Sequence, residues 1–169
     1  LVEGRPLEDI IPSAGMSFDE VLSIVEPLCD ALDTMHKQGI IHRDLKPENI
    51  IINDTGAHLV DLGLVTPLQS AMTLTTHGTE YFRDPEVVRQ ALRGSKVSEV
   101  DGARFDLYSA GAVLYYMVEG TFPAHGNLSR FDIESGDAIR WVIRRAMADY
   151  HKRYATSAEM LADVAGPFS

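Results

Sequence analysis

The sequence predicts one α+β domain that is mainly α-helical and contains a small β-hairpin. Two segments carry the helical evidence: residues 18–35 repeat apolar side chains at helical spacing, and residues 105–119 are apolar on nearly every side. Two short apolar runs around Asp54-Thr55-Gly56 are typical of a hairpin. The 169 residues suit a single domain, and 45% hydrophobic residues are enough to build its core.

Charge and cysteine content narrow the possible classes of function. A net charge of -10 argues against non-specific nucleic-acid binding, and no apolar run reaches the roughly 18 residues that a membrane span needs. The single cysteine, Cys29, excludes an internal disulfide, and its apolar neighbours predict a small buried side chain rather than a reactive thiol. We therefore expect a cytoplasmic protein in a reducing compartment.

The first elements along the chain are an extended start that runs into a short helix near Pro6, and then a long helix. Ser17-Phe18-Asp19-Glu20 is typical of a capping box that opens the long helix. Gly39 predicts where this helix ends. His36, close to that end, is expected to face solvent and to complement the helix dipole.

The stretch from His42 to Asn49 concentrates polar chemistry, because it combines two cations, two carboxylates, an imidazole and an amide. Apolar residues bracket it, with Ile40 and Ile41 before it and residues 50–52 after it. Two short buried strands would hold such a loop rigidly at both ends, as a functional site requires. A solvated connecting loop is the alternative interpretation.

The hairpin that follows suggests a metal site at its open end. If Asn53 opposes Ala57 across the turn, the same register places Asn49 opposite Asp61, with Asp44 nearby. An amide oxygen and a carboxylate are ligands that suit Mg²⁺, usually completed by phosphates and water. The alternative is a surface Asn–Asp pair that caps the hairpin.

The second half of the chain is predicted to be helical after an irregular, threonine-rich segment over residues 64–85. The helix over residues 105–119 has no polar face and is therefore buried, so Asp106 in its first turn must find hydrogen-bond partners. A further helix is expected over residues 137–148, with Trp141 in the core. Thr156-Ser157-Ala158-Glu159 is a second capping box, which opens a last short helix.

Three motifs resemble those of eukaryotic-type Ser/Thr protein kinases. His42-Arg43-Asp44-Leu45-Lys46-Pro47-Glu48-Asn49 resembles the catalytic loop of that family, and Asp61-Leu62-Gly63 resembles its metal-binding Asp-Phe-Gly, with leucine for phenylalanine. Residues 78–86 resemble the end of the activation segment. There, Asp84 stands in place of the alanine of Ala-Pro-Glu, and Arg83 stands in place of a customary apolar residue.

The resemblance extends from Val2 to Val164 but covers only the second half of a kinase domain. No Gly-x-Gly-x-x-Gly loop and no Val-Ala-x-Lys strand precedes the catalytic loop in this sequence. We therefore expect residues 1–169 to form a kinase C-terminal lobe that begins just after the hinge, with the N-lobe absent.

The resemblance also implies roles for individual residues. Asp44 would accept the proton of a substrate hydroxyl, and Lys46 would neutralise the transferred phosphoryl group. Asn49 and Asp61 would hold Mg²⁺. The adenine of ATP would pack on Leu7 and Ile51.

Other residues are expected to support this machinery. The resemblance gives His42 and Asp106 a structural role behind the catalytic loop, and it pairs Glu86 with Arg153. An ordinary surface arginine is the alternative for Arg153. Lys46 together with Thr79 fits the Ser/Thr type of kinase better than the Tyr type.

Arg43 suggests a way of ordering the activation segment. A phosphothreonine near its guanidinium would form charge-assisted hydrogen bonds. Thr73, Thr75 and Thr76 are equally good candidates from the sequence, although a threonine in a loop is more often structural than phosphorylated.

The sequence therefore predicts the C-lobe of a Ser/Thr kinase that transfers the ATP γ-phosphoryl group to a protein hydroxyl in the intact protein. Without the lysine and glycine loop of the missing N-lobe, the lobe alone should be nearly inactive. A pseudokinase or truncated lobe that acts as a binding scaffold is the alternative. Small-molecule phosphotransferases share a His-x-Asp loop but fit the other motifs less well.

The expected partners are a protein substrate, ATP with Mg²⁺, and the missing N-lobe. Neither nucleic acid nor a membrane is an expected partner of this segment. Leu7, Ile51 and Leu62 would form an apolar patch where the N-lobe and nucleotide normally lie, so the lobe alone is expected to self-associate.

Overall fold

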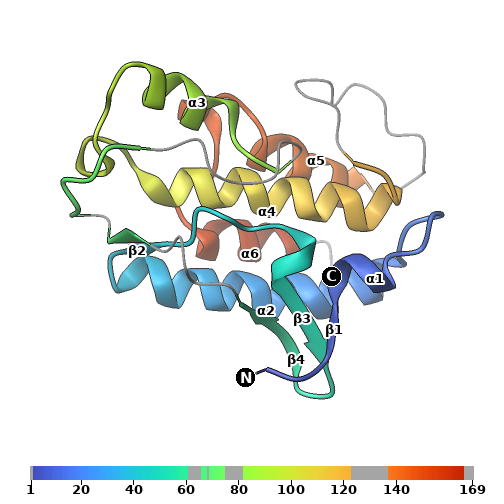
Figure 1. Cartoon of the computed structure of the whole chain (residues 1–169). Coiled ribbons are helices and arrows are strands. Elements are labelled where there is room, and N and C mark those ends of the chain that lie inside the picture. Colours follow the sequence, from blue (N-terminus) through green and yellow to red (C-terminus); the bar gives the residue numbers. More distant parts are fainter. Residues whose placement is uncertain (1, 61–65, 68, 75–81, 123–136, 166–169) are drawn as a thin grey trace.

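The computed structural model describes residues 2–60, 66–67, 69–74, 82–122 and 137–165. A long buried helix, α4 (Gly102–Glu119), crosses the middle of the molecule, with α2 (Phe18–Lys37) below it and α3 (Pro85–Leu92) above it in the view of Figure 1. Helix α5 (Asp137–Ala146) packs on α4, and α6 (Ser157–Ala165) packs on α2 and α5. The predicted helix-rich architecture is present in these residues.

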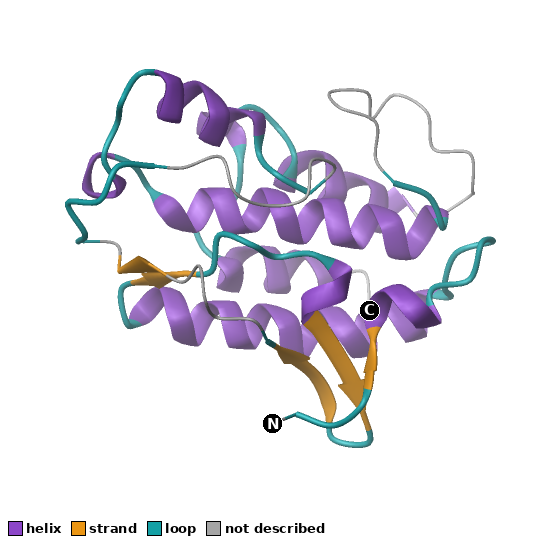
Figure 2. Ribbon diagram, viewed as in Figure 1, coloured by secondary structure: helices purple, strands orange, loops and turns teal. Residues whose placement is uncertain are grey.

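The strands form two small antiparallel sheets at the edge of the helical body (Figure 2). One sheet has the order β1 (Arg5–Pro6), β3 (Ile50–Asn53), β4 (Gly56–Leu59), and a four-residue helix, α1 (Leu7–Ile10), follows β1 directly. The other pairs β2 (Ile40–Ile41) with β5 (Thr66–Pro67). Short 3₁₀ turns occupy Pro47–Asn49, Val97–Glu99 and Tyr150–Lys152.

Helix α2 begins with the predicted capping box. The Ser17 hydroxyl accepts a hydrogen bond from the Glu20 N–H at 3.3 Å, and the Glu20 carboxylate accepts one from the Ser17 N–H at 2.9 Å. The helix ends at Lys37, and Gly39 follows with a φ of 74°. Its buried side is the predicted apolar stripe, which comprises Val21, Ile24, Val25, Leu28, Cys29 and Leu32.

The hairpin register differs by one residue from the predicted one. Asn53 opposes Gly56 rather than Ala57. The reason is a tight turn, because the Asn53 side-chain oxygen accepts the Thr55 N–H at 2.9 Å and closes the loop around only Asp54 and Thr55. The same shift aligns Asn49 with Val60, whose N–H donates to the Asn49 carbonyl oxygen at 2.9 Å. The predicted pairing of Asn49 with Asp61 is therefore wrong, and Asp61 lies outside the described residues.

Helix α4 begins at Gly102, earlier than the predicted start at Phe105, and it is buried along nearly its whole length. Gly111 lies close to α5, since a Cβ atom there would lie 2.7 Å from the Cβ of Ala146. The helix stops at Gly120, whose φ of 73° suits glycine. This central helix is the frame on which the polar loops are held.

Two hydrophobic clusters form the core. The larger joins α2, α4, α5 and α6, and the smaller consists of Ile41, Leu74, Val97 and Phe105. Residues 70–74 of the threonine-rich segment lie against this smaller cluster, since the Val97 N–H donates to Met72 O at 2.9 Å and the Leu74 N–H donates to Ser95 O at 3.0 Å. Residues 70–74 are therefore attached to the connection between α3 and α4.

Two side chains lie in environments that the sequence did not predict. Trp141 on α5 was expected in the core but is 49% exposed. Leu7 was expected in an exposed apolar patch but is fully buried, because α1 turns it inward against the main core. Leu62, another member of that patch, lies outside the described residues. The patch that motivated self-association is therefore not formed as predicted.

Two further findings concern membrane-spanning helices and the single cysteine. In the described residues, no helix is both long enough and apolar enough to cross a membrane. Cys29 is 1% exposed, and burial raises the pKa of its thiol to about 12, so the cysteine is a small core side chain as predicted.

Candidate active site

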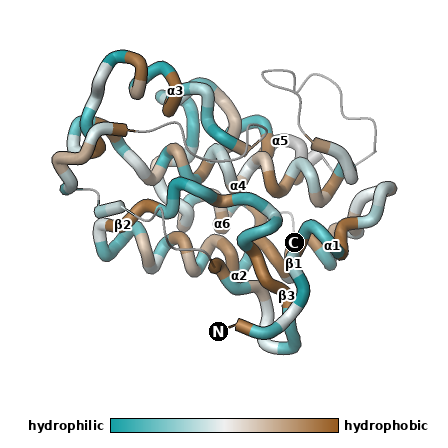
Figure 3. Tube along the Cα trace, in the orientation of Figure 1, coloured by the Kyte–Doolittle hydropathy of each residue, from teal (hydrophilic) through white to brown (hydrophobic). Residues whose placement is uncertain are grey.

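The stretch from His42 to Asn49, the predicted catalytic loop, connects β2 to β3 and is mainly hydrophilic between apolar strands (Figure 3). Among the described residues, Arg43 is the only non-glycine residue with a positive φ, at 74°. Such an angle strains an arginine by about 1–2 kcal/mol, so surrounding contacts must hold it.

Asp106 on α4 supplies those contacts. Its two carboxylate oxygens accept the backbone N–H groups of His42 at 2.8 Å and Arg43 at 2.9 Å. Asp106 itself is 1% exposed, so its carboxylate is shielded from water. The structure therefore places Asp106 directly behind the loop.

His36 takes part in the same cluster, contrary to the expectation that it faces solvent. Its Nε2 lies 2.8 Å from the Asp106 Oδ2, and its side chain is 10% exposed. The spacing of apolar residues in α2 could have predicted that His36 lies on the inner side of the helix, because position 36 follows Leu32 by one helical turn and continues the buried stripe. The end of α2 is therefore tied to the same carboxylate as the loop.

The His42 imidazole is fully buried and holds the loop from within. Its Nδ1 accepts the Asp44 N–H at 3.2 Å, and its Nε2 donates to the Val60 carbonyl oxygen at 3.2 Å. One accepting and one donating nitrogen require the neutral Nε2–H tautomer, which the partners assign. His42 thus links the backbone at Asp44 to the hairpin.

Asp44 lies at the centre of the candidate site and is 8% exposed. The Asn49 amide Nδ2 donates to the Asp44 backbone oxygen at 2.8 Å and to its Oδ2 at 3.2 Å. Lys46 Nζ lies 3.8 Å from the Asp44 Oδ1. A carboxylate, an ammonium group and an amide are therefore gathered within one short loop.

The orientation of Asn49 bears on metal binding. Because the side-chain Nδ2 of Asn49 donates to Asp44, the side-chain Oδ1 is the atom that suits Mg²⁺. The second predicted ligand, Asp61, lies outside the described residues. Among the described residues, this site included, no group of three or more His, Cys, Asp or Glu side chains could hold a metal. A magnesium ion that takes few protein ligands, with phosphates and water, remains compatible with this donor set.

The two predicted adenine contacts differ in accessibility. Leu7 has no exposed surface with which to touch a ligand, whereas Ile51 in β3 is partly exposed. Nearby, burial and the Glu48 carboxylate raise the pKa of Glu8 on α1, and Lys46 opposes this rise. The start of α1 therefore lies close to the candidate site.

Arg43 binds a threonine, although not one of those considered for phosphorylation. Its Nη1 donates to the Thr66 hydroxyl at 2.8 Å, and Thr66 is 3% exposed. Burial lowers the pKa of the guanidinium, and the Asp106 carboxylate opposes that shift. Thr73 is exposed and pairs with Lys96 in an isolated bridge. The other two candidates, Thr75 and Thr76, lie outside the described residues, as does Thr79.

The predicted pairing of Glu86 with Arg153 is wrong, because Arg153 binds Asp84. The Arg153 Nη2 donates to the Asp84 Oδ1 at 2.7 Å, and its Nη1 contacts the Asp84 Oδ2. Asp84 is the N-cap of α3 and points inward with 1% exposure. Burial raises the pKa of Asp84, while the two bonds from Arg153 oppose that rise.

Glu86 instead binds partners on its own helix. Its carboxylate accepts hydrogen bonds from Arg89 Nε and Gln90 Nε2, both at 2.7 Å. Burial alone would raise the pKa of Glu86, but these two bonds lower it below its ordinary value. The side chain of Glu86 therefore lies along α3 rather than across it towards Arg153.

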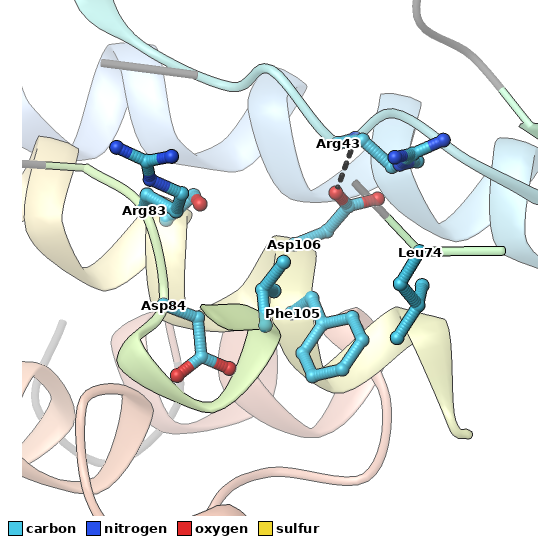
Figure 4. A pocket seen from close by; sticks show the side chains of 8 residues that line it. Arg43, Leu74, Arg83, Asp84, Phe105 and Asp106 are labelled. Atoms are coloured by element: carbon cyan, nitrogen blue, oxygen red, sulfur yellow. Dashed lines mark hydrogen bonds between the residues drawn. The ribbon is translucent and has the colours of Figure 1, made fainter. Parts of the chain in front are cut away.

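A pocket separates the catalytic loop from the end of the activation segment (Figure 4). Arg43 and Asp106 lie on one side of it, and Arg83 and Asp84 lie on the other. On the segment side, the Ser109 hydroxyl of α4 donates to the Phe82 carbonyl oxygen at 2.6 Å. The lining residues are Arg43, Leu74, Arg83, Asp84, Val87, Phe105, Asp106 and Ser109.

Sequence reasoning missed several of these contacts. The Asp84-Pro85 pair does signal a helix N-cap, because aspartate at that position followed by proline is a favoured start. The contact of Asp84 with Arg153, 69 residues away, has no local signal. The same holds for Ser109 and Thr66, whose hydroxyls bind partners from distant segments.

Comparison with known proteins places this geometry in a family. The sequence model of the protein kinase domain matches residues 1–163. A probable serine/threonine-protein kinase of Corynebacterium efficiens is 35% identical over an alignment 191 positions long, which includes 96% of this chain and 28% of that relative. Serine/threonine-protein kinase PknB of Mycobacterium tuberculosis is 31% identical, and the match covers 96% of this chain and 29% of PknB. Sperm motility kinase 2B of Mus musculus is 36% identical, and the match covers 73% of this chain and 25% of that kinase. The chain therefore spans only a minor part of the length of these relatives.

Proposed function

This chain belongs to the protein kinase domain family, and we propose that the complete protein carrying it transfers the γ-phosphoryl group of ATP to a serine or threonine hydroxyl of a protein. The observation that carries the proposal is the environment of Asp44. Its carboxylate is nearly buried, and Asn49 and Lys46 lie beside it. These are the residue types and spacings that phosphoryl transfer requires.

Asp44 is proposed to accept the proton of the substrate hydroxyl. The Asn49 amide fixes one carboxylate oxygen, and His42 fixes the backbone at Asp44 from the other side. A general base held in this way contributes about 10²–10⁴ in rate. Positioning and electrostatics supply most of the remaining acceleration.

Lys46 is proposed to stabilise negative charge on the transferred group. Its ammonium lies 3.8 Å from the Asp44 Oδ1, close enough to reach a phosphoryl group that sits beside the base. The Asn49 side-chain Oδ1 and Asp61 would hold Mg²⁺, which neutralises charge on the ATP phosphates when bound. Ile51 would contact the adenine.

A phosphothreonine near Arg43 remains a proposal about regulation. Its phosphate would meet a guanidinium whose Nη1 already donates to the Thr66 hydroxyl. A phosphate carries negative charge of its own, so its ion-paired hydrogen bonds to the guanidinium would be stronger than the bond from Arg43 to the neutral Thr66 hydroxyl. Thr73, Thr75 and Thr76 all stay candidates.

The test uses the complete protein, since no Gly-x-Gly-x-x-Gly loop or Val-Ala-x-Lys strand occurs within these 169 residues. We expect the chain alone to transfer phosphate far more slowly than the complete protein. Phosphate transfer to a generic basic protein is measured with ATP and Mg²⁺ for the wild type, Asp44→Asn and Asp54→Asn. Asp54 is a matched control because it lies exposed in the hairpin turn.

We expect Asp44→Asn to lower the rate about 10²–10⁴-fold and Asp54→Asn to leave it unchanged. A wild-type protein that transfers no phosphate would contradict the proposal and favour the scaffold role. Transfer that survives Asp44→Asn undiminished would show that another group is the base.

A further inference from the structure

We propose that Asp84, and not Glu86, is the residue that positions the end of the activation segment, so that a protein substrate is presented correctly to Asp44. The inference rests on the proposed function. It concerns a residue that departs from the Ala-Pro-Glu pattern of the family. Asp84 touches neither base nor substrate in this argument, and it acts through the segment that it holds.

The first observation is the completeness of the Asp84–Arg153 ion pair. Both carboxylate oxygens of Asp84 meet the guanidinium of Arg153, and the two residues are 1% and 5% exposed. Two-point contact of this kind adds directional precision to the charge attraction. The pair therefore fixes the orientation of Asp84 as well as its position.

The second observation is that Arg153 is itself held on several sides. Its Nε donates to the Ala148 carbonyl oxygen at 2.7 Å, and its Nη1 reaches the Arg104 carbonyl oxygen in α4 at 3.3 Å. The guanidinium carbon lies 4.9 Å from the centre of the Tyr108 ring. Asp84 is thus bound to a cation that is already fixed relative to α4.

The third observation is that the Asp84 carboxylate both caps α3 and binds Arg153. The Oδ1 of Asp84 accepts the Glu86 N–H at 2.9 Å and so caps α3, while it also binds Arg153. The residue before Asp84 lines the pocket that Arg43 lines from the catalytic loop (Figure 4). A shift of Asp84 therefore moves this wall of the pocket relative to the loop.

The fourth observation concerns the common frame of loop and segment. Asp106 and Ser109, one turn apart on α4, hold the catalytic loop and the Phe82 carbonyl respectively. Asp84 adds a second point of attachment just after Phe82. Two points define the direction of the segment end, whereas one point would leave it free to pivot.

Glu86, in contrast, makes its bonds within α3. Its partners Arg89 and Gln90 belong to the same helix, and the Arg89 side chain is 57% exposed. Such a surface pair adds little to the position of the segment. Asp84→Asn and Glu86→Gln remove the same charge two positions apart, so they form a matched pair of variants.

The experiment measures steady-state kinetics of the complete protein with a protein substrate and with ATP. For Asp84→Asn we expect the KM for the protein substrate to rise about tenfold or more, because misplacing a binding element costs productive geometry. The KM of Asp84→Asn for ATP should stay within about twofold of the wild-type value. For Glu86→Gln, the KM for the protein substrate and the KM for ATP should both stay within about twofold of the wild-type values. A Glu86→Gln effect equal to that of Asp84→Asn would overturn the proposal, as would equal changes in both KM values.

A second variant covers the case in which Asp84→Asn does not fold. Asp84→Glu keeps the charge but displaces the carboxylate by one methylene, so it should fold and still raise the KM for the protein substrate. An unchanged KM for that substrate would refute the positioning role.

The pairing is tested independently of activity by thermal unfolding of combined variants. Asp84→Asn and Arg153→Gln should be strongly non-additive in their shifts of the unfolding temperature, whereas Glu86→Gln and Arg153→Gln should be additive. The reverse pattern would overturn the assignment of Asp84. If the wild type transfers no phosphate, the proposed function fails, but this measurement still decides which carboxylate binds Arg153.

Discussion

Asp84 and Asp106 are both 1% exposed, and each holds a polar loop in place, but they do so by different means. Asp106 receives the backbone N–H groups of two loop residues and the ring of His36. Asp84 receives the guanidinium of one distant arginine and a single backbone N–H. One carboxylate is held mainly by backbone dipoles, and the other mainly by an ion pair.

The difference shows which contacts a sequence motif can specify. Backbone N–H groups are present whatever the side chains are, so a buried aspartate behind a loop finds the same donors in any member that shares the loop. An ion pair depends on which of two nearby carboxylates reaches the cation. Here the aspartate at the position of the family's alanine binds Arg153, while Glu86 binds Arg89 and Gln90.

The largest expected effect comes from removing the cation of the ion pair. Arg153→Met leaves the Asp84 carboxylate buried without its counter-ion, which should cost about 3–5 kcal/mol in the free energy of unfolding. Arg89→Met is the matched control, because Arg89 is 57% exposed and should cost about 1 kcal/mol or less. Denaturant unfolding of both variants measures the difference. Equal losses would mean that the two ion pairs do not differ as the structure indicates.

Asp106→Asn should have the next largest effect. The amide keeps one acceptor oxygen but loses the charge that strengthens the bonds from His42 and Arg43, so we expect a loss of about 2–3 kcal/mol. Asp101→Asn serves as the control, since Asp101 is 46% exposed and pairs with Arg104 at the surface. The same denaturant titration applies. A loss at position 106 no greater than that at position 101 would contradict the role of the buried carboxylate.

Raising the pH should lower the free energy of unfolding through Tyr108, which lies near Asp84, and this effect should be smaller than those of the two substitutions above. Burial, followed by the nearby Asp84 carboxylate, raises the pKa of Tyr108 from 10.0 to about 12. The unfolded chain therefore ionises first, so the stability that neutral Tyr108 provides is complete below pH 10 and is lost as the pH rises towards 12.

Tyr108→Phe isolates this contribution, because phenylalanine keeps the ring but cannot ionise. At pH 12 the wild type should have lost about 2 kcal/mol more than the variant, relative to pH 8. Unfolding free energies at both pH values test this. Parallel losses in the two proteins would show that the hydroxyl of Tyr108 titrates as it does in water.

The elements that could be predicted from sequence are those with local causes. The capping box at Ser17, the buried character of α4 and the burial of Cys29 follow from the residues within a few turns of each. The catalytic loop was identified through its family resemblance, and the structure gathers Asp44, Lys46 and Asn49 as that motif implies.

The errors arose where a single side chain changed a local geometry or reached across the molecule. The Asn53 side chain tightened the hairpin turn and shifted the register by one residue, which no alternation pattern can show. Trp141 lies outside the core although large aromatic residues are usually buried. The choice of Asp84 over Glu86 depends on a residue 69 positions away.

The positive φ of Arg43 has a consequence for protein design. Glycine accepts a φ of 74° without steric strain, so Arg43→Gly is the exchange that would relax this backbone position. That exchange would relieve the backbone but remove the donor that reaches Thr66 at the start of β5. The strained angle and the side-chain link between the catalytic loop and the segment beyond the hairpin thus belong to one residue, and relaxing the first removes the second.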